Sequence, residues 1–433
     1  MQVSIETLEG LERKMTVQIP SDTVSQAIEK KLKELSKTVR IDGFRPGKAP
    51  LKIVQQKFGG YVRQDVINDV LESSYREALM QENVRPAGMP NIESVSAEDK
   101  QDMTYTAVFE VYPVVEKLNL ATIKVEKPLA DISADDFDKM MMKLREQRKD
   151  WTEVTRSARQ GDKVTVDFEG RIDGELFEGG AAKDMEVEIG AGRMLKEFEE
   201  GLHGISAGEE KVATVNFPDD YHSKDVAGKK AEFTLKATKI SEPVLPEVDA
   251  EFAKTFGVED GDLDRLNADI RANMEKELAQ RLKSEIKNAV MNGLLEANEI
   301  IAPAALVAEE VKALKQQAVE RMGRNIESFD ISKLPDDVFA DEAAKRVKLG
   351  LLVNEVIKAA NIELDKDKMD STLEQISASY KDPAQIMEYY RQNKQAKASL
   401  EAMVLEDQVV DHILSQAIVT EKASSFSELV NGS

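Results

Sequence analysis

The stretch GFRPGK at residues 43–48 has residue types that could bind a phosphate group. A nucleotide-binding loop of this kind needs four residues between its glycines and a hydroxyl residue after its lysine. Here three residues separate Gly43 from Gly47, and Ala49 follows the lysine. Pro46 also removes a backbone N–H that would point at a phosphate. The sequence therefore argues against nucleotide binding at this loop.

The same region is unusually basic for this chain. Between Glu29 and Arg63 there are ten Lys or Arg residues against three acids, a net charge of +7, whereas the whole chain carries −22. A solvated basic tip between two helices is one explanation. Phe44 favours another, because loops rarely expose a large apolar side chain without a use. We expect this loop to contact a surface that offers an apolar pocket and negative charge.

Residues for metal binding or nucleophilic catalysis are scarce. The chain has no cysteine, and its only histidines, His203, His222 and His412, lie far apart in the sequence. No spacing of carboxylate and histidine recurs around them. We therefore expect neither a metal site nor Ser-His-Asp catalysis, and no cofactor.

Length and composition set wider bounds. With about 150 residues per domain as a prior, 433 residues predict roughly three domains. The pI of about 4.8 argues against general nucleic-acid binding, including direct binding to DNA. No apolar run reaches the length of a membrane helix, and the N-terminus MQVSIETLEGLERKM lacks the pattern of a secretory signal. Together with the missing cysteines, these features favour the cytoplasm.

The hydrophobic pattern changes along the chain and predicts a multidomain α+β protein. Residues 1–112 combine alternating strands with helical spacing. Residues 113–149 are too short for a core of their own, and we expect them to pack on another domain. Residues 150–245 are rich in glycine and alternate as strands, which predicts a β-rich domain. From about Asp249 everything reads as helical, so that residues 246–433 are predicted to be all-α.

The basic loop resembles the ribosome-docking signature of the trigger factor family, the bacterial chaperones at the peptide exit. The similar run is VRIDGFRPGKAP at residues 39–50, and the likeness extends to MQVSIET at the start and VRPAG at residues 84–88. It implies docking on the large ribosomal subunit beside the tunnel exit. The residues it assigns to this contact are Gly43, Phe44, Arg45, Pro46, Gly47 and Lys48.

The middle region resembles prolyl isomerases of the FK506-binding-protein type. DFEGRIDGELFE at residues 167–178, EEGLHGISAG at residues 199–208 and DYH at residues 220–222 match in order and spacing. The resemblance implies a pocket, with the Leu195 N–H and the Tyr221 hydroxyl holding the substrate carbonyl. The residues it assigns to the catalytic pocket are Phe168, Phe177, Glu178, Met194, Leu195, Phe198, Tyr221 and Phe233. It also places Met185 among the pocket-lining positions, and Phe217 and His222 near the wall or rim.

Such a pocket would need no acid–base pair. The planar X–Pro amide faces a rotation barrier of about 18–20 kcal/mol that arises from resonance. An apolar pocket stabilises the polar planar amide poorly and the twisted amide better. The alternative is that these aromatic residues form only the core of a small β domain, which for any one of them alone is the better explanation.

The apolar residues of the predicted helical region, residues 246–433, could likewise form either a core or a binding surface. The family resemblance implies two helical arms that enclose a cradle for unfolded nascent polypeptides, without ATP. It also implies that residues 113–149 pack on this C-terminal domain. Residue by residue, packing between helices explains the apolar positions better, yet methionine suits a surface that binds varied clients. The candidate client-binding residues are Met322, Phe329, Met369, Met387 and Tyr390.

The sequence therefore predicts a ribosome-docking chaperone with a prolyl isomerase domain. A stand-alone prolyl isomerase with scaffold domains is the alternative, and a non-catalytic helical adaptor is a third reading. Dimerisation of the chain away from the ribosome stays open.

Overall fold

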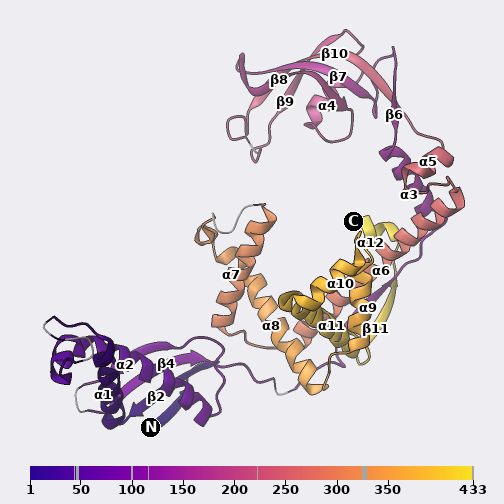
Figure 1. The fold of residues 1–433 in the computed structure, drawn as a ribbon. Helices are drawn as coiled ribbons and strands as arrows, with labels where there is room; N and C mark the ends of the chain where they lie inside the picture. The colour runs from indigo at the N-terminus through magenta and orange to yellow at the C-terminus, as the bar shows by residue number, and fades with distance from the viewer. Residues whose placement is uncertain are drawn as a thin grey trace. The chain divides into compact units, whose positions relative to one another are not determined.

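The computed structural model of the chain describes residues 1–42, 44, 48–98, 101–115, 117–221, 223–323 and 329–431 (Figure 1). The chain folds into two compact units. One comprises Met1–Pro128 and Lys283–Lys422, and the other comprises Leu129–Leu282 and Ala423–Ser433. Each unit is therefore assembled from segments that lie far apart in the sequence.

An antiparallel sheet forms the N-terminal part of the first unit. Its strands are β1 (Gln2–Thr7), β2 (Glu12–Ile19), β3 (Asn91–Ser96) and β4 (Met103–Glu110), in the order β1-β2-β4-β3. Met15 of β2 lies opposite Ile5 of β1 and Ala107 of β4. Along β4 fully buried side chains alternate with half-buried ones, which is the period-2 pattern that predicted this strand.

Two helices, α1 (Ser21–Thr38) and α2 (Leu51–Gln81), pack together beside this sheet. Leu32 of α1 and Val54, Val62 and Val66 of α2 share one buried cluster. The apolar face of α2 continues on both sides of the glycine pair at residues 59–60. Packing of that face offsets the helix-weakening effect of glycine, so that α2 runs unbroken through the pair.

The remainder of the first unit is mainly helical. Its elements are the second part of α6 (Leu263–Ala297), α7 (Ala304–Arg321), the short 3₁₀ helix η2 (Ile331–Lys333), α8 (Asp337–Ala359), α9 (Lys366–Ser377), α10 (Pro383–Gln392) and α11 (Lys394–Leu414). The breaks between these helices fall at residues that interrupt helices locally: Pro303 caps α7, Asn361 with φ 49° follows α8, and Pro383 begins α10. No described helix has both the length and the apolar character that a membrane crossing demands.

The core of this helical part also includes strand residues from earlier in the chain. Val290 of α6, Leu352 of α8 and Val409 of α11 pack together with Ile123 and Val125. The strand β5 (Lys124–Leu129) then pairs with β11 (Ile418–Ala423). The prediction that everything after about Asp249 is helical is therefore wrong at β11. Every side chain of that strand is exposed, so its sequence carries no buried-strand pattern.

The second unit contains a sheet against which a short helix packs. Its strands are β6 (Asp150–Glu153), β7 (Lys163–Ile172), β8 (Glu175–Glu188), β9 (Glu210–Asn216) and β10 (Lys230–Val244). They follow the order β6-β10-β7-β8, and β9 also pairs with β10. Figure 1 shows the helix α4 (Lys196–Leu202) against one face of this sheet. Its residues Phe198 and Leu202 belong to the buried core of the sheet.

A buried charge pair fixes the loop between β6 and β7. The Arg156 guanidinium donates to the Asp162 carboxylate, with Nη1–Oδ2 2.5 Å and Nη2–Oδ1 3.0 Å, and to Glu242 of β10 at 2.9 Å. The Arg159 N–H donates to Asp162 at 2.7 Å. Burial would raise the pKa of the Asp162 carboxyl, but these donors outweigh it and lower the pKa below its usual range.

A second apolar cluster of this unit joins α3 (Ala134–Gln147), α5 (Ala250–Thr255), α12 (Phe426–Asn431) and the first part of α6. Ser133 and Asp136 cap the start of α3 reciprocally, which satisfies two backbone donors of its first turn. Phe137 of α3 packs here with Phe252 of α5, Met274 of α6 and Phe426 of α12.

Candidate functional site

The alternation of β7 and β10 places phenylalanine rings on one face of their sheet. Phe168 of β7 lies opposite Leu235 of β10, and Phe233 of β10 lies opposite Gly170 of β7. Residues two apart on a strand share a face, so Phe168 and Phe233 become diagonal neighbours. Their ring centroids lie 5.8 Å apart. Both side chains are buried.

Phe233 is the centre of a larger aromatic cluster. Its ring centroid lies 5.3 Å from that of Phe198, 5.9 Å from that of Phe177 and 6.4 Å from that of Phe217. The first two pairs meet at 81° and 86°, the edge-to-face geometry that aromatic quadrupoles favour. The cluster is therefore a packed and oriented set of rings contributed by β7, β8, β10, α4 and the segment after β9.

Two glycines make room for these rings. A Cβ atom on Gly170 would lie 2.5 Å from the Phe233 ring and 2.9 Å from the Phe177 ring. On Gly180 it would lie 3.0 Å from the Phe177 ring. Real Cβ atoms essentially never approach other atoms as closely as at Gly170, and the contact at Gly180 is tighter than most, so a side chain at either position requires the rings to move.

The rings line a cavity of about 390 Å³. All eight residues that the sequence assigned to a catalytic pocket lie on its wall, and Phe217 lies there as well. Met185 instead packs against the neighbouring core, and His222 falls outside the described residues. The full lining is Phe168, Phe177, Glu178, Gly179, Gly192, Arg193, Met194, Leu195, Phe198, Val215, Phe217, Tyr221, Ser223, Val226 and Phe233.

Glu199 is a residue of this site that sequence reasoning missed. It lies on α4 next to Phe198 and is only 6% exposed. Its Oε2 accepts from the Gly190 N–H at 2.8 Å and the Gly192 N–H at 3.4 Å, and its Oε1 accepts from the Met194 N–H at 3.1 Å. One carboxylate therefore holds the loop that carries Met194 and Leu195 into the cavity.

The cavity wall also offers a backbone donor. Leu195 caps the start of α4, and its carbonyl accepts from the Phe198 N–H at 2.9 Å. Among the described residues no acceptor lies within hydrogen-bonding distance of the Leu195 N–H itself. Tyr221 lines the same cavity, and its ring centroid lies 4.8 Å from that of Phe217.

The charged residues that line the cavity are exposed, while the carboxylate of Glu199 is buried behind the loop it holds. Glu178 and Arg193 are exposed, whereas Phe168, Phe198 and Phe233 are buried. Within the described residues there is no group of His, Cys, Asp or Glu side chains that could hold a metal ion. The arrangement suits binding of an apolar ring or side chain with its backbone near the Leu195 N–H.

The basic loop lies between α1 and α2. Phe44 is 41% exposed, and its N–H donates to the Ile41 carbonyl at 3.0 Å. Lys48 is exposed as well. Gly43, Arg45, Pro46 and Gly47 fall outside the described residues.

The candidate client-binding residues separate into two groups. Met369, Met387 and Tyr390 are partly buried around Leu373 and Leu400, where α9, α10 and α11 pack together. Packing between helices, which the sequence left as the simpler explanation, describes these three. Met322 is 60% exposed at the end of α7, and Phe329 is half-buried.

Comparisons with known proteins cover the whole chain. The family described as "Bacterial trigger factor protein (TF)" matches residues 1–144, and its C-terminal part matches residues 262–415. The family "FKBP-type peptidyl-prolyl cis-trans isomerase" matches residues 154–238, which include the aromatic cavity.

Full-length relatives agree with this order of domains. The chain is 48% identical to the trigger factor of Thioalkalivibrio sulfidiphilus over all of this chain and 98% of that protein. It is 44% identical to the trigger factor of Pseudoalteromonas atlantica over all of this chain and 99% of that protein. A solved trigger factor chaperone aligns with a TM-score of 0.50 and 18% identity over 96% of this chain and 99% of that chain, a likeness in fold. The chain belongs to the trigger factor family of chaperones and carries an FKBP-type peptidyl-prolyl cis-trans isomerase domain.

Proposed function

We propose that this chaperone isomerises X–Pro bonds in the cavity around Phe233 while it docks on the large ribosomal subunit and binds unfolded nascent chains. The observation that carries the proposal is the aromatic cavity itself. A prolyl ring fits among the buried phenylalanine rings of the cavity. The preceding carbonyl can accept from the Leu195 N–H, which the loop presents and which has no acceptor within the described part of the chain. The charged lining residues Glu178 and Arg193 are exposed, and the buried side chains around the twisting amide are aromatic.

Catalysis in this proposal comes from differential stabilisation of the twisted amide. Phe168, Phe198 and Phe233 surround the proline ring and exclude water from the amide. The Leu195 N–H and the Tyr221 hydroxyl hold the substrate carbonyl while the C–N bond turns. A barrier lowered by about 5–6 kcal/mol would give roughly ten-thousandfold acceleration. Phe177, Glu178 and Met194 complete the wall of the cavity.

Replacement of the Tyr221 hydroxyl tests this assignment with little change of shape. We expect Tyr221→Phe to lower kcat/KM about threefold to tenfold, the effect of one neutral hydrogen bond. The measurement is isomerisation of a short proline peptide. Phe177→Leu, which removes a ring from the wall but no hydroxyl, serves as the comparison. A Tyr221→Phe rate equal to that of the unchanged chain would remove the hydroxyl from the mechanism.

Docking at the ribosome is proposed to use the loop at residues 43–48. Phe44 is the apolar anchor, Arg45 and Lys48 supply positive charge, and Gly43, Pro46 and Gly47 belong to the same contact loop. An exposed phenylalanine on a basic loop supports this role, because aromatic anchors with flanking cations dominate many interfaces. The partner is the ribosomal surface beside the tunnel exit, and the chain is proposed to act in the cytoplasm.

The other parts of the chain complete the proposal. Residues 1–112 form the docking domain, residues 150–245 the isomerase domain and residues 246–433 the client-binding domain, with residues 113–149 as the segment between them. Clients contact exposed apolar positions of the helices without ATP, and Met322 is the candidate with the most exposed side chain. Pairing of two chains away from the ribosome would cover such positions.

Co-sedimentation with ribosomes tests the docking proposal. Phe44→Ala should weaken ribosome binding at least tenfold, as loss of an interface hot spot does. Tyr61→Ala is the matched control, since Tyr61 is an aromatic residue of α2 that is 74% exposed and outside the loop. If Phe44→Ala co-sediments as the unchanged chain does, the loop is not the anchor. A stand-alone prolyl isomerase would then become the better description.

A further inference from the structure

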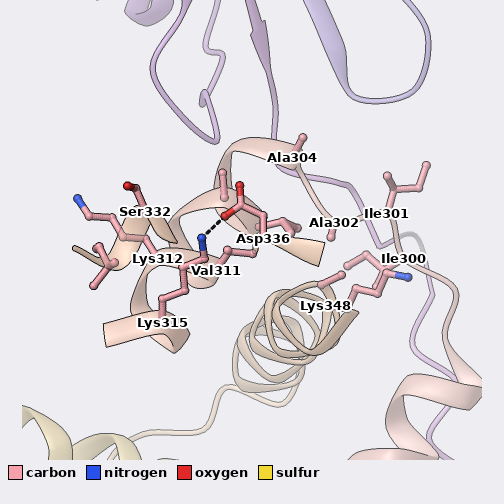
Figure 2. A pocket seen from close by; sticks show the side chains of 14 residues that line it. Ile300, Ile301, Ala302, Ala304, Val311, Lys312, Lys315, Ser332, Asp336 and Lys348 are labelled. Atoms are coloured by element: carbon pink, nitrogen blue, oxygen red, sulfur yellow. Dashed lines mark hydrogen bonds and ion pairs between the residues drawn. The ribbon is translucent and has the colours of Figure 1, made fainter. Parts of the chain in front are cut away.

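A second cavity, of about 800 Å³, lies beside the helix pair α7 and α8 (Figure 2). Its lining is mostly aliphatic and includes Ile300 and Ile301 before α7, Val307 and Val311 on α7, and Ile331 of η2. No aromatic ring occurs among the described residues that line it. Ile301 is 60% exposed. The volume falls within the range of about 300–1,000 Å³ that is typical of ligand-binding pockets.

Three lysines border this aliphatic surface, and one of them is neutralised. Lys315 is 8% exposed in its side chain and forms an ion pair with Asp336, just before α8. Lys312 and Lys348 have no carboxylate within ion-pair distance among the described residues. Figure 2 shows these two lysines on opposite sides of the cavity, with the Lys315–Asp336 pair between them.

We propose that this cavity binds aliphatic segments of unfolded polypeptides that carry an acidic residue on each side. Two separated ammonium groups suit a ligand with a carboxylate at both ends, which an extended peptide provides and a fatty acid does not. The aliphatic wall fits leucine, isoleucine or valine side chains. Because the chain carries a net charge of −22, two unpaired lysines beside an apolar surface provide a local attraction for acids that the rest of the molecule repels. The inference rests on the proposed client binding and gives it a sequence preference.

Matched peptides test the preference directly. Three short peptides share one leucine-rich core and differ only in their flanks, which are aspartate, asparagine or lysine. Binding to the full chain is measured by calorimetry at low and at raised salt. We expect the aspartate peptide to bind about fivefold more tightly than the asparagine peptide, as two partly screened ion pairs would give. Raised salt should remove most of that difference.

Two lysine variants separate this cavity from the general charge of the chain. Lys312→Gln combined with Lys348→Gln should remove the advantage of the aspartate peptide over the asparagine peptide. Lys366→Gln combined with Lys381→Gln changes the net charge equally at exposed lysines outside the cavity and should preserve the advantage. Ala308→Trp, at an exposed position of the lining, should weaken all three peptides.

Other outcomes would overturn the proposal. Equal binding of the three peptides, or an aspartate preference that survives loss of both cavity lysines, excludes the cavity as its source. Binding of decanoate together with absent peptide binding would make the occupant an anionic amphiphile. A permanently unfolded protein is titrated in parallel. If the unfolded protein binds while the peptides do not, this inference fails and the proposed client binding stands. If neither the unfolded protein nor the peptides bind, the proposed client binding fails as well.

Discussion

Glu199 provides the sharpest test of how the isomerase cavity is built. Its carboxylate accepts three backbone N–H groups from the loop that delivers Met194 and Leu195. Glu199→Gln keeps the shape of the side chain but leaves one acceptor oxygen, because the other position becomes an NH₂ donor that faces an N–H. The loop therefore loses at least one charge-assisted hydrogen bond, worth about 1.5–3 kcal/mol.

That loss sets the size of the expected effect. If catalysis requires the loop in the position that Glu199 holds, 1.5–3 kcal/mol corresponds to roughly a tenfold to hundredfold lower kcat/KM. Isomerisation of a proline peptide gives the rate, and amide hydrogen exchange of Gly190 and Met194 reports the loop itself. We expect both amides to exchange faster in Glu199→Gln. Glu200→Gln is the matched control, since Glu200 is the adjacent, exposed residue of α4.

A particular combination of results would refute this reasoning. Glu199→Gln could lower the thermal stability of the domain and speed exchange of the loop amides, yet leave kcat/KM unchanged. The carboxylate would then support the fold alone, and the position of Leu195 would not matter for catalysis.

Three further predictions concern the same domain. Phe198→Leu should preserve the fold and lower isomerase activity severalfold. Phe198→Ala should destabilise the domain by about 3–5 kcal/mol in denaturant titration, because the ring is only 2% exposed. Gly170→Ala should displace the Phe233 ring, which its Cβ would meet at 2.5 Å, and reduce activity more than stability; unchanged activity would show that the ring position is not critical. Asp162→Asn should lower the unfolding free energy by about 2–3 kcal/mol. Because the pKa of Asp162 is lower in the folded state, its contribution is complete above about pH 4 and is lost as the pH falls further. Unfolding followed from pH 6 downward should therefore show the unchanged chain and Asp162→Asn converging in acid.

The sequence predicted secondary structure best where the hydrophobic periodicity of a segment matches the side of it that is buried. β4 and β7 alternate because one face of each packs on a core, and the same alternation places Phe168 among the other rings. The proline and asparagine breaks at residues 303, 361 and 383 act locally, so the helix limits near them were predictable. The clustering of the assigned pocket residues followed from a family resemblance and not from periodicity.

Features that depend on distant segments were not predictable. A glutamate on a short helix is expected to be exposed. Glu199 is buried because the loop at residues 190–194 packs against it. Strand β11 is exposed along its length and pairs with β5 far earlier in the chain. The unpaired state of Lys312 and Lys348, among described residues, depends likewise on how α7, η2 and α8 pack.

Crosslinking to a stalled ribosome–nascent chain complex, mapped by residue, tests the central claim most directly. A photoreactive residue in the nascent chain reports which parts of this chaperone it touches, and one at position 44 reports the docking partner. We expect nascent-chain crosslinks in the helices between residues 300 and 414 and in the cavity around Phe233, together with crosslinks from position 44 to the large ribosomal subunit. Nascent chains that crosslink only to the isomerase cavity, with no ribosomal contact from position 44, would contradict it.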